Sequence, residues 1–270
     1  MDDGRGELTQ IVVETRALLE RERAKGRTRL TLGSVAARPA DGPSGSPPPF
    51  SSTEILALPG FEHLVPSQPA AIPAPPSLTL REDLPQDLGA LSRLVSTCRK
   101  CGLCETRTQT VFADGAPAAR LLLVGEAPGR DEDAQGIPFV GRAGQLLNKM
   151  LAAIDLKREE TYICNVLKCR PPENRTPLPE EVERCLPYLE QQIALIRPAL
   201  ICALGLSAVQ ALLRTKASMA SMRGRTFEFR GVPLVPTYHP AALLRNPGLK
   251  REAWVDLQRV RDLLRAGGAA

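Results

Sequence analysis

The feature that most constrains the fold is a regular alternation of short apolar runs with longer amphipathic segments after Pro85. Short apolar runs indicate strands, and segments with apolar residues on one face indicate helices. Strands separated by helices form a parallel sheet, because a parallel connection needs a long crossover. We therefore predict an α/β fold, a three-layer αβα sandwich with a central, mainly parallel four-stranded sheet. The predicted strands are 119–126, 161–167, 199–205 and 232–240, and the predicted helices are 87–97, 143–154, 179–193, 206–213 and 254–264.

The part of the chain that precedes this alternation has a different composition. Residues 1–25 place apolar side chains on one face of a predicted amphipathic helix, which we expect to bind a partner protein. Residues 26–85 are rich in Pro, Ala, Ser and Gly and bury too little apolar surface to offset the entropy of ordering, so we predict a disordered linker. The segment EILALPGFEHLV within it is apolar enough to dock. One main domain, residues 86–266, remains.

Charge and hydropathy narrow the class of protein. The formal net charge of +5 weakly favours a polyanionic partner. No apolar run approaches the roughly 20 residues needed to span a bilayer. The chain begins with acidic residues, without the basic and then apolar order of a secretory signal. We expect a cytoplasmic monomer with no membrane partner.

Cysteines are the next unusual feature, since the chain has 7 of them. An odd number in a reducing compartment argues against a disulfide framework. Cys98 and Cys101 form a CxxC pair, while Cys169 and Cys185 bracket a segment rich in proline and charge. Four thiolates from these places could hold an iron–sulfur cluster or a structural zinc ion, and inert buried thiols are a third interpretation. Cys104 forms a second CxxC that overlaps the first.

Polar residues follow three of the predicted strands at the point where each strand ends. Glu126, Asn165 and His239 occupy these positions. Ligands of parallel α/β sheets bind beyond the carboxyl ends of the strands, so we expect these side chains to meet in one site. Cys164 and Cys202 lie inside apolar runs and are predicted to pack in the core.

Several motifs occur in a fixed order along the chain. CxxCxL comes first, followed by GEAPG at 125–129, PFVG at 138–141, ICNVLKCRPPENR at 163–175 and HPAALLRNP at 239–247. Together they closely resemble the iron–sulfur-containing family 4 uracil-DNA glycosylases, over about residues 87–264. The resemblance implies the uracil-DNA glycosylase fold and base excision repair. Such an enzyme flips uracil out of double- or single-stranded DNA and hydrolyses its N-glycosidic bond, which leaves an abasic site.

The resemblance also implies how the cysteines are used. Cys98, Cys101, Cys169 and Cys185 would hold a structural 4Fe-4S cluster, and Cys104 stands outside the pattern. No hydrolytic step needs the electrons of that cluster.

For the base site, the resemblance implies a role for each of several strand-end and loop residues. Phe139 stacks on the flipped uracil, and Asn165 reads its polar edge, because an amide offers one acceptor and two donors. His239 lies near uracil O2, where a donor stabilises the departing anion. Gly125 and Ala127 line the same site.

The catalytic carboxylate is less defined, because Ala127 stands where family 1 enzymes carry an aspartate that activates water. Glu126 and Glu132 are the candidates, since a carboxylate stabilises an oxocarbenium-like state. Asp131 and Asp133 are interpreted as a solvated acidic turn.

DNA contacts are expected from the loop after the last strand. Leu243 or Leu244 fills the gap left by the extruded base, and Arg245 approaches a phosphate. A cluster near the first helix would orient further basic side chains toward phosphates, namely Lys168, Arg170 and Arg175.

Other functions stay open at this stage. A non-catalytic nucleic-acid-binding module could keep the fold and the cluster, although retention of Phe139, Asn165 and His239 together favours an enzyme. A relative that traps uracil-DNA covalently needs a histidine in an inserted loop, which the segment after Lys168 lacks. Family 5 enzymes differ at the position of Glu126, which is not acidic in them.

Overall fold

The computed structural model describes residues 79–267, so the predicted N-terminal helix and most of the predicted linker lie outside the described residues. Tertiary contacts begin before the expected domain boundary at residue 86. The backbone N–H of Arg81 donates to Oε1 of Gln191 at 2.9 Å, and Leu84 is buried against Tyr188 and its neighbours. The last residues assigned to the linker therefore pack on the domain.

A single sheet forms the centre of the domain, with strand order β1-β3-β2-β4-β6-β5. Its four inner strands are parallel, as predicted. The prediction of four strands in total is wrong, because short antiparallel strands flank this set on both edges. These edge strands have 2 and 3 residues, too few to show a period of two in the sequence. The strands are β1 (Asp114–Gly115), β2 (Leu121–Gly125), β3 (Tyr162–Asn165), β4 (Leu200–Leu204), β5 (Phe227–Phe229) and β6 (Val232–Thr237).

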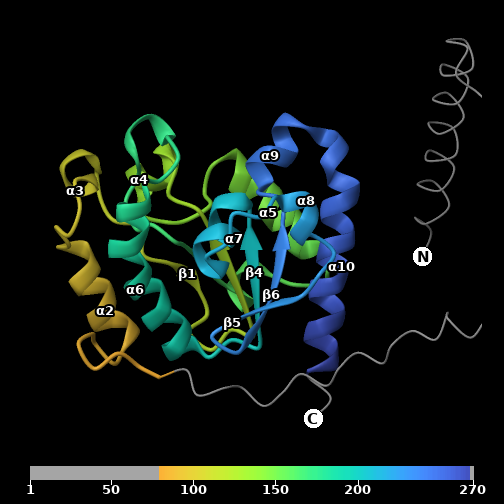
Figure 1. Ribbon diagram of the computed structural model, residues 1–270, viewed down its shortest axis with the longest axis horizontal. Helices are drawn as coiled ribbons and strands as arrows, with labels where there is room; N and C mark the ends of the chain where they lie inside the picture. Colours follow the sequence, from red (N-terminus) through yellow and green to blue (C-terminus); the bar gives the residue numbers. More distant parts are fainter. Residues whose placement is uncertain (1–78, 268–270) are drawn as a thin grey trace, which may run out of the picture. The chain divides into compact units, whose positions relative to one another are not determined.

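Helices cover both faces of the sheet, which confirms the three-layer αβα architecture (Figure 1). Alternate residues of β2 point to opposite faces, so Leu122 packs in one core layer and Leu123 in the other. Cys164 and Cys202 are both fully buried, as predicted for core residues. One layer holds α6 (Pro179–Ile196) and α7 (Leu206–Leu213), and the other holds α5 (Arg142–Ala152) and α10 (Lys250–Ala266).

Shorter helices connect these layers. Helix α2 (Leu88–Ser96) packs its apolar residues Leu91 and Val95 against Tyr188 of α6, at the edge of the domain (Figure 1). The side chain of Asp87 starts α2 by accepting the backbone N–H of Ala90 at 2.7 Å. None of the helices described is long and apolar enough to cross a membrane. The remaining helices are α2 (Leu88–Ser96), α3 (Leu103–Thr106), α4 (Arg130–Gln135), η2 (Arg158–Glu160), η3 (Pro172–Asn174), α8 (Met219–Met222), α9 (Pro240–Arg245) and η4 (Pro247–Leu249).

Candidate functional site

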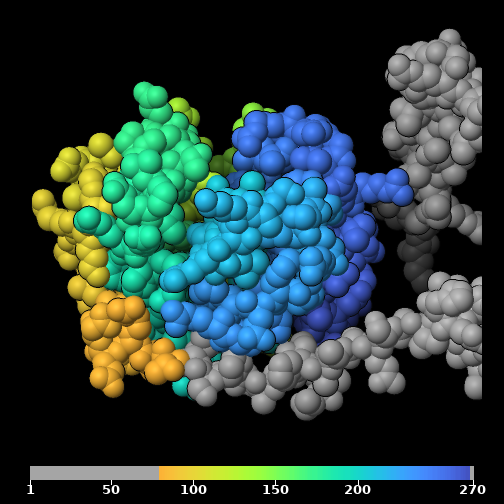
Figure 2. Space-filling model, in the orientation of Figure 1, coloured from red at the N-terminus to blue at the C-terminus, as the bar shows by residue number. Residues whose placement is uncertain are grey.

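A cleft of about 610 Å³ lies where the inner strands end. Since β2, β3, β4 and β6 are parallel, their carboxyl ends meet at the same edge of the sheet. The predicted residues Glu126, Asn165 and His239 all line this cleft. Figure 2 shows the molecule hollowed at its top, between the green segment that follows β3 and the blue segment that contains α9. The expectation that strand-end side chains meet in one site is therefore confirmed.

Asn165 is the most unusual polar residue of the cleft. The residue is 1% exposed, and its Oδ1 atom has no hydrogen-bond partner within residues 79–267. A buried amide oxygen without a partner is unfavourable by about 1–3 kcal/mol. Such an atom is expected where a ligand supplies the missing donor.

Gly125 allows this arrangement because it has no side chain. A Cβ atom at Gly125 would lie 2.3 Å from Oδ1 of Asn165 and 2.7 Å from Cζ of Phe139. Even alanine at this position would displace one of the two side chains. The GEAPG motif thus provides the space in which an aromatic ring and an amide meet.

Phe139 and His239 present nearly parallel rings to the cleft. The ring centroids are 5.4 Å apart and the planes differ by 29°. Phe139 is 6% exposed and adopts a φ of 54°, an uncommon conformation for an aromatic residue. Both rings line the cleft, so a flat base stacked on Phe139 would lie close to the imidazole.

The protonation of His239 follows from its contacts. Its Nδ1 accepts the backbone N–H of Ala241 at 3.1 Å, which caps α9. The proton of a neutral imidazole must then lie on Nε2. Burial, with a smaller contribution from Arg245, lowers the pKa of His239 to about 4. His239 is therefore a neutral hydrogen-bond donor near pH 7.

The two candidate carboxylates differ in their surroundings. Glu132 accepts three backbone N–H groups, from Gly129 at 3.1 Å, Val140 at 3.0 Å and Gly141 at 3.1 Å. Glu126 lines the cleft, and its carboxylate makes no hydrogen bond or ion pair within the described part of the chain. Of the two, Glu126 has the oxygens that are free to act on a ligand.

The acidic turn that surrounds Glu132 is only partly solvated. Asp131 is exposed, as expected. Asp133 is 3% exposed, and both of its carboxylate oxygens accept the backbone N–H of Thr108 at 3.0 Å. Its interpretation as a solvated residue is wrong, because it ties α4 to the loop after α3. Ala127 is half-buried at the cleft wall and packs against Leu103 and its neighbours.

The segment after His239 forms helix α9, and not the predicted loop. Leu243 is 2% exposed and packs in the core, whereas Leu244 is 38% exposed. Of this pair, only Leu244 can reach DNA without unpacking the core. Arg245 is exposed and lines the cleft.

Two basic residues of the segment after β3, Lys168 and Arg175, do not share one role. Lys168 is 1% exposed, and its Nζ donates to the backbone oxygen of Asn165 at 2.7 Å. The prediction that Lys168 faces phosphates is therefore wrong. Arg175 lines the cleft but binds both carboxylate oxygens of Glu181, at 2.6 and 2.9 Å.

Three polar residues of the cleft escaped the sequence analysis, namely Asn174, Thr176 and Tyr238. Asn174 lines the cleft from the same segment, and its Oδ1 accepts Nε of Arg170 at 2.7 Å. Its φ of 56° lies in the left-handed region, which asparagine tolerates better than most residues. A polar residue in a proline-rich loop that returns to a strand end is the signal that could have identified it.

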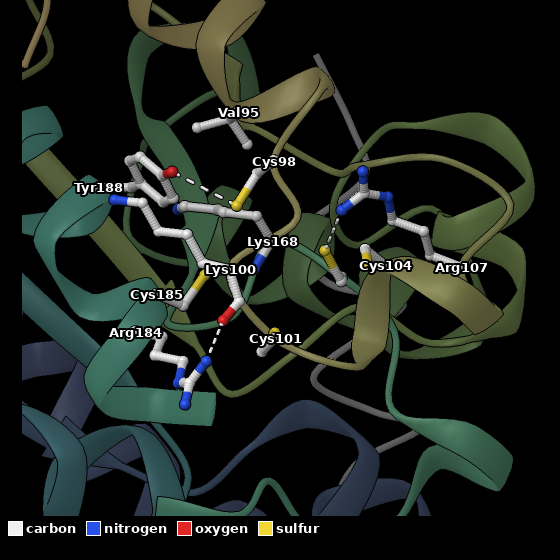
Figure 3. A pocket seen from close by; sticks show the side chains of 11 residues that line it. Val95, Cys98, Lys100, Cys101, Cys104, Arg107, Lys168, Arg184, Cys185 and Tyr188 are labelled. Atoms are coloured by element: carbon white, nitrogen blue, oxygen red, sulfur yellow. Dashed lines mark hydrogen bonds between the residues drawn. The ribbon is translucent and has the colours of Figure 1, made fainter. Parts of the chain in front are cut away.

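The predicted cysteines also come together, in a separate small pocket beside α2 and α6 (Figure 3). Cys98, Cys101, Cys169 and Cys185 line this pocket, and Cys104 lines it as well. All of them have free thiols. Within residues 79–267, no group of three Cys, His, Asp or Glu is arranged to hold a single metal ion. The thiols therefore share a pocket without forming a tight single-ion site.

Hydrogen-bond donors surround the thiols of this pocket. NH1 of Arg107 donates to Sγ of Cys169 at 3.0 Å, and the hydroxyl of Tyr188 donates to Sγ of Cys98 at 3.4 Å (Figure 3). The backbone N–H of Lys168 donates to Sγ of Cys185 at 3.3 Å. Donors aimed at sulfur are typical of iron–sulfur sites, where they stabilise the negative charge. The donor set thus fits a group held by four thiolates.

Burial favours the protonated form of the thiols that line this pocket. It raises the pKa of the Cys101 and Cys169 thiols, and it raises the pKa of the Cys185 thiol to about 12. A bound metal group must therefore displace protons from these thiols. The basic side chains that line the pocket would then offset the charge of the thiolates, and they are Lys100, Arg107, Lys168 and Arg184.

The fold and the cleft define a class: an αβα protein with a ligand site at the carboxyl ends of parallel strands, lined by an amide, an aromatic ring and a neutral histidine. The family model of the Uracil DNA glycosylase superfamily matches residues 112–258. The Type-4 uracil-DNA glycosylase of Archaeoglobus fulgidus is 44% identical over 186 residues, 66% of this chain and 94% of the relative.

Two further relatives carry the same name. The protein of Pyrobaculum aerophilum is 45% identical over 179 residues, 63% of this chain and 91% of the relative. That of Thermotoga maritima is 41% identical over 192 residues, 70% of this chain and 98% of the relative. The chain belongs to the uracil-DNA glycosylase superfamily and, within it, to the type-4 family.

Proposed function

We propose that this protein removes uracil from DNA by flipping the base into the cleft and hydrolysing its N-glycosidic bond. The observation that carries the proposal is the buried, unpartnered Oδ1 of Asn165 beside the ring of Phe139. Uracil supplies what this site lacks, because its N3–H can donate to Oδ1 while its flat ring stacks on Phe139. The names of the type-4 relatives support the same activity.

Selectivity follows from the same amide. Nδ2 of Asn165 is a donor that can reach O4 of uracil while Oδ1 accepts N3–H. Cytosine places an amino donor where uracil has O4, and its N3 is an acceptor, so both contacts become repulsive. A buried site of this kind rejects the mismatched base strongly, because buried polar groups remain unpaired.

His239 stabilises the leaving group. As the glycosidic bond breaks, negative charge grows on uracil O2, and the Nε2–H of a neutral imidazole donates to it. Because the pKa of His239 is low, the imidazole is neutral before the reaction. It acts by donating a hydrogen bond, so no proton needs to leave it. A fixed donor aimed at developing charge accelerates such a step by about 10²- to 10³-fold.

Glu126 is the carboxylate that we assign to the sugar side of the reaction. Its oxygens are free, whereas those of Glu132 are held by three backbone N–H groups. A carboxylate near C1′ stabilises an oxocarbenium-like sugar and orients the attacking water. Leu244 would fill the gap that the flipped base leaves, and Arg245 would contact a neighbouring phosphate.

For the cysteine pocket we propose a 4Fe-4S cluster held by Cys98, Cys101, Cys169 and Cys185. Such a cluster supplies a rigid four-point crosslink when it is bound, and no step of the hydrolysis passes through it. These thiols come from the segment after α2, the segment after β3 and helix α6. Joining them would fix the segment that carries Asn174 beside the cleft.

The decisive experiment uses the full chain with a labelled oligonucleotide that contains one uracil, followed by alkaline cleavage at abasic sites. We expect cleavage of single- and double-stranded uracil DNA, and none of a matched oligonucleotide with thymine. A non-catalytic binding module would bind the uracil DNA and leave it intact, which would refute the enzyme proposal. We further propose that one copy of the chain acts alone, since one chain supplies every group named above. We also propose that it acts in the cytoplasm.

A further inference from the structure

Phe139 adopts a backbone conformation that it would not choose by itself. Its φ of 54° lies in the left-handed region, which is unfavourable by about 1–2 kcal/mol for a residue with a side chain. Such a conformation persists only where the surroundings determine it more strongly. We call residues 138–141, which present the Phe139 ring to the cleft, the platform loop.

The backbone N–H groups of the two residues that follow Phe139 are held by one carboxylate. Oε1 of Glu132 accepts the backbone N–H of Val140 at 3.0 Å and that of Gly141 at 3.1 Å. Its other oxygen accepts the N–H of Gly129 in the GEAPG turn at 3.1 Å. The carboxylate thereby ties the platform loop to the turn that follows β2.

Two carbonyl groups of the same loop are held by one guanidinium. NH2 of Arg158 donates to the oxygen of Pro138 at 2.6 Å, and NH1 donates to the oxygen of Phe139 at 3.1 Å. Nε of Arg158 donates to Asp114 of the edge strand β1 at 2.7 Å. The Arg158 side chain is 16% exposed, so water screens these contacts only partly.

Helix α5 closes the remaining side. A Cβ atom at Gly144 would lie 1.7 Å from the carbonyl oxygen of Phe139, so only glycine allows this approach. The carbonyl of Phe139 is therefore confined between α5 and the guanidinium of Arg158. Loss of that guanidinium would leave the carbonyls of Pro138 and Phe139 without their charged donor.

We propose that Arg158 is a positioning residue of the base site, which acts through Phe139 by holding the platform loop in its left-handed conformation. Asp114 orients Arg158 in this role. The planar fork of an arginine can bind two carbonyls and a carboxylate together, which a lysine cannot do. The proposal rests on the proposed function, because it assigns Phe139 as the surface on which the base stacks.

A double-mutant cycle tests whether Arg158 acts through Phe139. Arg158→Ala should lower the single-turnover rate of uracil cleavage by about ten- to a hundredfold, because a small displacement of a positioned group is costly. In a Phe139→Leu background, which should itself be slower, the same change should lower the rate by less than about twofold. Equal factors in both backgrounds would overturn the proposal.

Two further variants separate positioning from folding. Arg120→Ala removes an arginine contact of the same kind but outside the cleft, since NH2 of Arg120 donates to the backbone oxygen of Leu264 at 2.7 Å. It should lower thermal stability without changing the cleavage rate. Arg158→Lys keeps the charge and should recover only part of the rate, and full recovery would contradict a role for the fork geometry.

Hydrogen exchange gives a readout that does not depend on activity. Arg158→Ala should speed exchange of the Val140 and Gly141 amides by at least about tenfold, while the amides of β2 stay protected. Unchanged exchange at Val140 and Gly141 would overturn the proposal even if activity fell. A wild-type protein that cuts no uracil DNA would refute the proposed function, and this exchange experiment would still decide whether Arg158 holds the loop.

Discussion

The base cleft and the cysteine pocket are both lined by residues that are far apart in the sequence, but they differ in what holds their side chains in place. In the cleft, His239 is held by the backbone N–H of Ala241, and the carbonyl of Phe139 is held by Arg158. In the pocket, the thiols accept hydrogen bonds from Arg107 and Tyr188, and no three ligand groups of the described residues are arranged around one ion.

The two sites also differ in which elements of the fold set their geometry. The cleft obtains its geometry from parallel strands whose ends are held by the sheet. The pocket joins loops and helices at the edge of the domain, where no strand fixes the spacing of the sulfur atoms. We therefore expect substitutions in the cleft to change chemistry with little effect on folding, and substitutions in the pocket to change stability first.

The largest effect is expected for His239→Ala. Removal of the donor near uracil O2 should lower the single-turnover cleavage rate by about 10²- to 10³-fold. DNA affinity should change little, because the donor acts mainly in the transition state. Rates are measured with enzyme in excess over a labelled uracil oligonucleotide, and affinity by fluorescence anisotropy on the same DNA. A variant that loses DNA binding as strongly as cleavage would contradict this role.

Asn165→Asp should give the next largest effect and tests whether the amide reads the base. The carboxylate has no donor for uracil O4, so uracil cleavage should fall by about 10²-fold. Cytosine can donate its amino group to the carboxylate, so the preference should shift toward cytosine. Parallel assays on uracil- and cytosine-containing oligonucleotides measure the ratio. Full uracil activity with unchanged selectivity would exclude Asn165 as the base reader.

Cys169→Ser tests the cysteine pocket, with Cys104→Ser as its matched control. Loss of one ligand should remove most of the iron and lower Tm by about 10 °C, because metal binding contributes to folding. Cys104→Ser should keep both iron and Tm. Protein purified without oxygen is analysed for iron, sulfide and zinc, and its Tm is measured by calorimetry. Zinc without iron in the unchanged protein would refute the cluster.

The smallest effect concerns pH. The pKa of His239 is lowered from 6.5 to about 4 by burial, so the donor stays neutral through the whole range from about pH 8 to pH 5. The single-turnover rate should therefore change by less than about twofold between about pH 8 and pH 6. Because the unfolded chain binds this proton near pH 6.5 and the folded chain does not, stability from this group is lost as pH falls from 6.5 toward 4. A rate that falls with a midpoint near 6.5 would contradict the low pKa.

Much of the architecture could be predicted because it is encoded locally. The predicted helix at 206–213 coincides with α7, and the four inner strands lie where apolar runs predicted them. The placement of Glu126, Asn165 and His239 at one edge follows from parallel strands alone. The edge strands β1 and β5 could not be predicted, because they are too short to carry a period.

The amino-acid sequence by itself determined the order of strands and helices, the strand-end positions of the polar residues and the spacing of the cysteines. Only the tertiary structure decided which member of each similar pair is free to act, since burial depends on contacts between distant segments. Leu243 is buried while Leu244 is exposed, and Glu132 is held by amides from two loops while Glu126 is free. The pattern of a local segment fixes its conformation, but the partners of its side chains come from elsewhere in the chain.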